Sequence, residues 1–78
     1  MLDLQKALAD IARAIVDDPD AVSVSMTESE ESIMLELSVA PDDMGMVIGR
    51  HGRIAKAIRT VMKAAAANCG KKIAVEIR

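Results

Sequence analysis

Two glycines, Gly49 and Gly52, enclose Arg50 and His51 and form the pattern G-x-x-G in the second half of the chain. Glycine adopts positive φ without a steric penalty and lets the backbone approach a ligand closely. A helical pattern begins directly after Gly52, so its first backbone N–H groups and the positive end of its dipole face this turn. Such a place binds anions, and a nucleic-acid backbone supplies phosphates at regular spacing. The loop is therefore predicted to contact phosphate groups.

The bare pattern G-x-x-G occurs more often at a simple corner between two helices than at a binding site. Its surroundings decide between these two interpretations. The apolar pair Val47-Ile48 precedes the loop, and basic residues begin inside it and continue along the following helix. A short motif gains weight when its context agrees with it. The context therefore favours anion binding over a plain corner.

The formal net charge is −2, but acidic and basic residues are separated along the chain. Residues 1–43 contain eleven acidic and two basic residues, a formal charge of −9. Residues 44–78 contain eight basic residues and one acidic residue, a formal charge of +7. A polyanion is recognised by a local basic surface and not by the total charge. The usual alternative, a solvated helix face, is less favoured here because the basic run starts inside the glycine loop.

The chain has 78 residues, and we expect residues 1–78 to form one compact two-layer domain. The N-terminus lacks the basic and apolar regions of a signal peptide, and no apolar stretch approaches the roughly 18 residues of a membrane span. The single cysteine, Cys69, cannot form an internal disulfide and is expected to be a small buried residue in a reducing compartment. We therefore expect a cytoplasmic protein without membrane contact.

The first half of the chain predicts one helix and two strands. Apolar residues recur at three- and four-residue spacing from Asp3 to Val16, the pattern of an amphipathic helix. The sequence Asp17-Asp18-Pro19-Asp20 ends it, since the residue before proline avoids the helical conformation. The alternating segments 22–27 and 33–39 predict strands joined by a charged turn. The first strand is expected to bury Val22, Val24 and Met26, and the second Ile33, Leu35, Leu37 and Val39.

The second half predicts two helices and a last strand. Pro41 and Asp42 are suited to opening and capping a short helix that reaches about Ile48. A longer helix follows the loop and is expected to stop at Gly70. Its predicted buried stripe consists of Ile54, Ile58, Val61, Met62 and Ala65. Residues 72–77 alternate again and predict the final strand.

These elements predict an α+β fold of order α-β-β-α-α-β, with three helices on one face of a three-stranded sheet. This order, with the glycine loop between the second and third helices, resembles the type II KH domain, in which the loop clamps about four nucleotides of a single strand. The run from Met44 to Arg59 and the first helix ending in Asp18-Pro19-Asp20 resemble the small bacterial single-KH proteins of the KhpA family. The resemblance covers essentially the whole chain.

The resemblance implies an RNA-binding protein, an RNA chaperone or post-transcriptional regulator linked to cell elongation and division. It also implies a homodimer or a heterodimer with a second KH-containing protein of the KhpB or Jag type. At one position the chain departs from the general KH pattern G-x-x-G-x-x-I, because Ala55 stands where isoleucine is usual, with Ile54 beside it. The shape of the apolar groove and any base preference therefore do not follow from the resemblance.

The resemblance assigns contacts with single-stranded RNA to the loop and its neighbours. The predicted RNA-binding residues are Ile48, Gly49, Arg50, His51, Gly52, Arg53, Ile54 and Lys56. Arg50 is a permanent cation that forks onto phosphate, whereas His51 is mostly neutral near pH 7 and contributes one hydrogen bond. An exposed side chain without a role is an equally weighted alternative for His51. Arg59 and Lys63 are predicted to be solvated charges.

An apolar groove is expected beside the loop, although core packing is the stronger interpretation for most of its residues. Its floor is predicted to comprise Ile48, Ile54, Ala55 and Ile58 with Leu37 or Val39. The chain has no Phe, Tyr or Trp, which excludes the RRM sheets and OB-folds that stack bases on aromatic rings. RNA binding is expected to be weak and loosely specific, since each stacking contact contributes about 1–3 kcal/mol.

No catalytic, metal or cofactor site is predicted. The only histidine lies 18 positions from the only cysteine, no Gly-Lys-Ser/Thr sequence follows the glycines, and the carboxylates are placed at turns and on solvent faces. One alternative function of another class remains, a KH fold that mainly dimerises and binds little RNA by itself. Met44 and Met46, next to the loop, are candidate interface residues of such a module.

Overall fold

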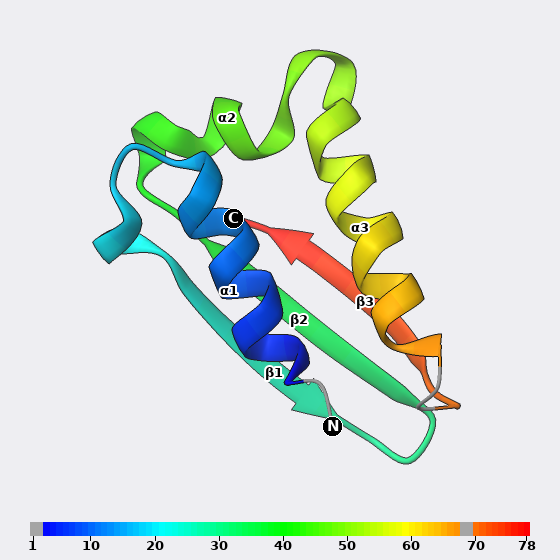
Figure 1. The fold of residues 1–78 in the computed structure, drawn as a ribbon. Helices are drawn as coiled ribbons and strands as arrows, with labels where there is room; N and C mark the ends of the chain where they lie inside the picture. Colours follow the sequence, from blue (N-terminus) through cyan, green and yellow to red (C-terminus); the bar gives the residue numbers. More distant parts are fainter. Residues whose placement is uncertain (1–2, 68–69) are drawn as a thin grey trace.

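A computed structural model describes residues 3–67 and 70–78 (Figure 1). The helices and strands in these ranges are α1 Leu4–Ile15, β1 Ser23–Glu28, β2 Ser32–Ser38, α2 Met44–Ile48, α3 Arg53–Ala65 and β3 Lys72–Ile77. Short 3-10 helices occupy Pro19–Ala21, Pro41–Asp43 and Arg50–Gly52. The predicted order α-β-β-α-α-β and the α+β class are confirmed. Cys69, predicted to be buried, lies outside the described residues.

The sheet is mixed, with β2 in its centre and the strand order β1-β2-β3. β1 pairs antiparallel with β2, and Met26 faces Leu35 in the register. β3 pairs parallel with β2, and Leu35 faces Val75. A parallel pair needs a long crossover connection, which α2 and α3 provide. All three helices lie on the same face of the sheet (Figure 1).

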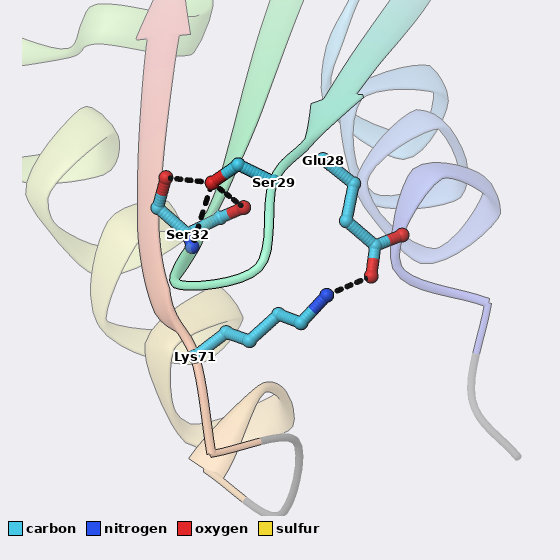
Figure 2. A network of polar contacts seen from close by, with 4 residues as sticks. All are labelled: Glu28, Ser29, Ser32 and Lys71. Carbon is cyan, nitrogen blue, oxygen red and sulfur yellow. Dashed lines mark hydrogen bonds and ion pairs between the residues drawn. The ribbon is translucent and has the colours of Figure 1, made fainter.

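Polar contacts hold the hairpin between β1 and β2 and join it to β3 (Figure 2). The backbone N–H of Ser29 donates to the Ser32 carbonyl at 2.8 Å, and the two serine hydroxyls are 3.0 Å apart. Lys71, directly before β3, forms an ion pair with Glu28 at the end of β1. The ion pair thereby connects the end of β1 with the start of β3 next to the hairpin.

The core lies between the sheet and the helices. Its largest fully buried side chains are Leu8, Leu35, Leu37, Val47 and Met62. They come from α1, β2, α2 and α3, so each of these elements contributes to one packed layer. Burying a side chain of this size contributes about 1.5–3 kcal/mol. The alternation of Ile33, Leu35 and Leu37 toward the helices is confirmed.

The first helix begins and ends as predicted. The carboxylate of Asp3 accepts the backbone N–H of Lys6 at 3.1 Å and caps the N-terminus of α1. The helix ends at Ile15, just before the Asp-Asp-Pro sequence. Its buried residues are Leu4, Leu8, Ala9 and Ala12. None of the helices in the described part of the chain is long and apolar enough to cross a membrane.

The predicted buried stripe of α3 is partly wrong. Ile58 and Met62 are buried, but Ile54 and Val61 are 37% and 52% exposed. The buried stripe runs instead through Ala55, Ile58, Met62 and Ala66. The helix is therefore rotated relative to the prediction, with the larger Ile54 and Val61 on its outer side.

Two further predictions are corrected, the burial of Met26 and the end of the last helix. Met26 is 41% exposed, and its strand β1 lies at the edge of the sheet. The last helix ends at Ala65 and does not reach Gly70. Gly70 has a φ of 69° and lies in the turn that leads into β3. Ala66 is the C-cap of α3, and its backbone N–H donates to the Met62 carbonyl at 3.0 Å.

Candidate nucleic-acid interface

The glycine loop makes a sharp connection between α2 and α3. The N–H of Gly49 donates to the Gly45 carbonyl at 2.8 Å and closes the last turn of α2. Gly49 then has φ 76° and ψ 173°, and Gly52 has φ 72° and ψ 16°. The positive φ predicted for both glycines is confirmed. His51 is also left-handed, at φ 59°, a conformation that histidine adopts more readily than most residues and that the sequence did not reveal.

The two glycines have different surroundings. A Cβ atom on Gly49 would lie 2.6 Å from Cγ1 of Ile54, so the Ile54 side chain packs directly against the Gly49 backbone. A Cβ atom on Gly52 would meet nothing within 4 Å. Gly49 is therefore required by space and by conformation, and Gly52 by conformation alone.

The start of α3 lies at the end of this loop. Gly52 is its N-cap, and no side chain caps the helix. The N–H of Arg53 donates to the Arg50 carbonyl, which closes the short 3-10 helix within the loop. A helix start without a side-chain cap leaves backbone donors and the positive dipole end available to an anion.

The predicted basic residues surround this helix start. Arg50, His51, Arg53 and Lys56 are all exposed. Among the described residues, none of the four forms an ion pair, because the ion pairs found involve Lys6, Arg13, Lys71 and Arg78. Glu76, the one acidic residue after position 43, lies 3.4 Å from Arg78 and is neutralised there. The positive charge at the loop is therefore not compensated locally.

The predicted groove floor separates into two groups. Ile48 and Ile54 are 38% and 37% exposed and stand on either side of the loop. Ala55, Ile58 and Leu37 are buried in the core, which confirms the packing interpretation for them, and Val39 is half-buried. Ile48 and Ile54, with Met46 of α2 at 38% exposure, are the exposed large apolar side chains next to the loop.

Two charged residues differ from prediction. Arg59 is exposed, but its Nε donates to the Val75 carbonyl at 3.2 Å and is not simply solvated. Asp43 lies in the 3-10 turn before α2, as predicted for carboxylates, but it is 4% exposed and not on a solvent face. Its Oδ2 accepts the backbone N–H of Asp18 at 3.0 Å, and neither Asp42 nor Asp43 caps α2 through its side chain. Lys63 is exposed, as predicted.

The sequence did not reveal the hydrogen bonds of Arg59 and Asp43, because their partners, Val75 and Asp18, are distant along the chain. One signal was present for Arg59, which stands four residues after Ala55 and next to Ile58, and so borders the buried stripe of α3. The described residues contain no group of three or more His, Cys, Asp or Glu side chains placed to hold a metal ion.

Comparison with known proteins places this chain among KH domains. A family model described as "KhpA/KhpB, KH domain" matches residues 5–77. The chain is 58% identical over 74 residues to the RNA-binding protein KhpA of Clostridium acetobutylicum, which covers 95% of this chain and 99% of that protein. It is 61% identical over 67 residues to the RNA-binding protein KhpA of Clostridium perfringens, covering 86% and 89%.

Two solved structures share the fold. Aquifex aeolicus Era bound to GDP and AlF4⁻ has a TM-score of 0.61 at 20% identity, with 99% of this chain and 31% of that chain covered. Era in complex with MgGDPNP and nucleotides 1506–1542 of 16S ribosomal RNA has a TM-score of 0.62 at 20% identity, covering 97% and 30%. This chain spans about three-tenths of the length of these Era structures. At this identity the likeness shows the fold alone.

Proposed function

This chain belongs to the KhpA family of RNA-binding KH-domain proteins, and we propose that it binds single-stranded RNA through its glycine loop. The contacting residues in this proposal are Ile48, Gly49, Arg50, His51, Gly52, Arg53, Ile54 and Lys56. Residues 1–78 act as one KH domain. The cellular role that the resemblance implies is post-transcriptional regulation or RNA chaperoning linked to cell elongation and division.

The observation that carries this proposal is the uncompensated positive loop at the start of α3. Gly49 and Gly52 bring the backbone to the surface, and Arg50, Arg53 and Lys56 are exposed without a carboxylate partner among the described residues. Phosphates bind at such helix starts because N–H groups and the dipole act together. Arg50 supplies a fork for one phosphate, and His51 donates one hydrogen bond.

A single strand fits this surface better than a duplex. KH domains clamp the backbone of unpaired nucleotides and leave the bases free to contact an adjacent groove. Ile48 and Ile54 lie beside the loop and offer aliphatic contact to those bases. The chain has no aromatic side chain for stacking, so affinity for a short RNA is weak.

The test is the double substitution Arg50→Asp with His51→Asp, which places two carboxylates where phosphate binds. Aspartate tolerates the left-handed conformation of position 51, so the loop keeps its shape. Binding of a short fluorescent RNA, followed by anisotropy, is expected to be abolished, while the free energy of unfolding changes by no more than about 0.5 kcal/mol per site.

A matched control is Lys6→Glu with Ser25→Glu, which changes the net charge by the same amount on exposed residues of α1 and β1. It is expected to retain most of the affinity. A duplex of the same sequence is expected to compete poorly at equal salt. RNA affinity unchanged in the loop variant, or equal affinity for duplex, contradicts the proposed loop function.

A second function is favoured by an exposed apolar surface that adjoins the loop between α1 and α3. Ile11 and Ile15 of α1 border a hollow with Ile54, Ala57 and Val61 of α3, and we name this surface the α1/α3 apolar face. Val61 is 52% exposed, more than the other exposed large apolar residues of the described chain. Arg53 is the one charged residue that borders the hollow.

We propose that a second copy of this chain covers the α1/α3 apolar face. In a two-fold dimer the same surface meets itself. Because the α1/α3 apolar face has a single charged residue at its rim, no like charges from the two copies meet at the centre of the contact. The family description also suggests a second possible partner, a related KH domain of the KhpB type. Two linked KH domains offset the weak affinity of one.

The test of this assembly is Val61→Glu, measured by sedimentation equilibrium. It is expected to convert a dimer into a monomer, because it places a charge within an apolar contact. Met26→Glu is the control, since Met26 is also a large exposed apolar residue, on β1. A dimer that persists in Val61→Glu, or a wild type that is monomeric at every concentration, contradicts the assembly through this face.

A further inference from the structure

The side chain of Ile54 lies between the glycine loop and the α1/α3 apolar face. A Cβ atom placed on Gly49 would lie 2.6 Å from Cγ1 of Ile54, so this side chain rests directly on the Gly49 backbone. The same side chain borders the hollow of about 420 Å³ that Ile11, Ile15 and Val61 also line. Ile54 therefore contacts the backbone of the proposed RNA clamp and lines the proposed surface for a second copy.

The shape of the loop depends on what rests on Gly49. Its N–H donates to the Gly45 carbonyl at 2.8 Å, and its carbonyl accepts the Gly52 N–H at 3.2 Å. Gly49 thus joins the last turn of α2 to the 3-10 turn that follows. Glycine loses more conformational freedom on folding than any other residue, so packing from a neighbour is needed to hold it in one conformation. Ile54 provides that packing.

We propose that a second copy on the α1/α3 apolar face holds Ile54 against Gly49 and thereby raises the affinity of the loop for RNA. In a single copy the hollow is open to water, and the Ile54 side chain exchanges between a dominant rotamer on Gly49 and minor rotamers turned toward the hollow. A second copy fills the hollow and leaves only the rotamer on Gly49. This proposal rests on the proposed RNA binding and on the proposed assembly of two copies.

The coupling acts in both directions. A ligand shifts an equilibrium between two states only through a difference in its affinity for them. RNA and the second copy both favour the state with Ile54 on Gly49, so each strengthens the binding of the other. Coupling of this kind usually changes affinity by about fivefold or more. It differs from avidity, which requires one RNA long enough to reach two loops.

The adjoining surfaces allow two alternatives. In the first, the two surfaces are independent, and the second copy leaves the affinity of each loop unchanged. In the second, the second copy covers Arg53, which borders the hollow and is also a predicted RNA contact, and binding becomes weaker. The three cases therefore differ in the sign of the effect of assembly on RNA affinity.

The test uses a fluorescent tetranucleotide of mixed sequence, because a KH loop clamps about four nucleotides and so short an RNA cannot bridge two copies. Dimeric wild type is expected to bind it at least about fivefold more tightly, by anisotropy, than monomeric Val61→Glu. Val61 stands nine residues after Gly52, about 14 Å along the helix axis, so the substitution does not touch the loop.

The matched control is Thr60→Glu, which adds the same charge one residue away. Thr60 is exposed and does not border the hollow. Thr60→Glu is expected to remain dimeric and to bind the tetranucleotide within about twofold of the wild type. It separates loss of assembly from simple repulsion between the new carboxylate and RNA.

Two further measurements test the reciprocity and the route. Saturating tetranucleotide is expected to lower the dimer dissociation constant of the wild type, in sedimentation equilibrium, by the square of the measured factor, because each dimer holds two RNA molecules. Without RNA, hydrogen exchange of the Gly49 and Gly52 amides is expected to be slower in the dimer than in Val61→Glu. The Ser29 amide, which donates to the Ser32 carbonyl at the hairpin, is the reference and is expected to be unchanged.

Equal affinity of dimer and monomer for the tetranucleotide, tighter binding by Val61→Glu, or an equal loss in Thr60→Glu overturns the coupling. Coupling without slower exchange of the Gly49 amide overturns the role of Ile54. In each of these cases, binding that still depends on Arg50 and His51 leaves the proposed RNA-binding function intact. A wild type that is monomeric at every concentration overturns the assembly and the coupling together, and binding that is independent of the loop overturns the proposed RNA-binding function.

Discussion

Gly49 and Gly52 show at the scale of single residues why the spacing of this loop matters. Gly49 combines φ 76° with ψ 173°, a region in which only glycine is stable, and its Cα faces the Ile54 side chain. Gly52 occupies the left-handed helical region, which costs other residues about 1–2 kcal/mol. The first glycine therefore sets the loop against α3, and the second only turns the chain.

Three alanine substitutions are expected to rank accordingly in free energy of unfolding. Gly49→Ala loses the most, more than about 2 kcal/mol, because strain at positive φ adds to the overlap with Ile54. Gly52→Ala loses about 1–2 kcal/mol. Gly45→Ala, inside α2 with no contact for its Cβ, is neutral or gains up to about 1 kcal/mol. Urea unfolding measures all three, and a Gly49→Ala variant as stable as Gly52→Ala contradicts the packing against Ile54.

At the scale of elements, α2 depends on a contact with the segment that follows α1. Asp43, directly before α2, accepts the backbone N–H of Asp18 at 3.0 Å across 25 residues. Because α2 has only five residues, it has little helical stability of its own. This buried carboxylate therefore holds α2, and the glycine loop behind it, against the rest of the fold.

Removing the Asp43 carboxylate is expected to destabilise the protein more than removing the carboxylate of the neighbouring Asp42. Asp43→Ala leaves the Asp18 N–H without its partner and is expected to lower the free energy of unfolding by about 1–3 kcal/mol. Asp43→Asn keeps an acceptor oxygen and should lose less. Asp42→Ala is the matched control, because Asp42 is exposed and makes no side-chain cap. Thermal unfolding of the three variants checks the order, and equal melting temperatures for Asp43→Ala and Asp42→Ala refute it.

At the scale of the whole molecule, charge is expected to limit how much RNA one domain contacts. The basic residues near the loop are uncompensated, whereas residues 1–43 carry eleven acidic side chains, which are expected to repel a strand that extends beyond the loop. We therefore expect a short footprint on RNA. Ile54 borders both the loop and the α1/α3 apolar face, so the proposed RNA-binding surface adjoins the proposed surface for association of two copies.

This distribution predicts weak binding with a steep dependence on salt. Each phosphate neutralised on a single strand contributes about 0.7 to the slope of log affinity against log salt, so three or four contacts give a slope of roughly −2 to −3. Two covalently joined copies are expected to bind a long RNA about 10²–10⁴-fold more tightly than one copy. A salt series with both proteins measures these quantities, and a salt-insensitive single copy with nanomolar affinity contradicts the prediction.

Most of the local structure followed from the sequence by itself. The element order, the start and end of α1, the alternation in β2 and the positive φ of Gly49 and Gly52 depend on neighbouring residues, so periodicity, caps and glycine chemistry were sufficient to predict them. The basic residues around the loop were exposed as expected. Their role in binding RNA remains a prediction.

The tertiary structure alone decided which side of α3 is buried and where two charged groups bond. The sequence pattern allowed a stripe through Ile54 and Val61, but the buried stripe runs through Ala55, Ile58, Met62 and Ala66, so the larger Ile54 and Val61 face outward. Arg59 bonds to a residue 16 positions away and Asp43 to one 25 positions away. Helix rotation and contacts between distant segments depend on how several elements pack at once, and periodicity within one segment carries no information about that packing.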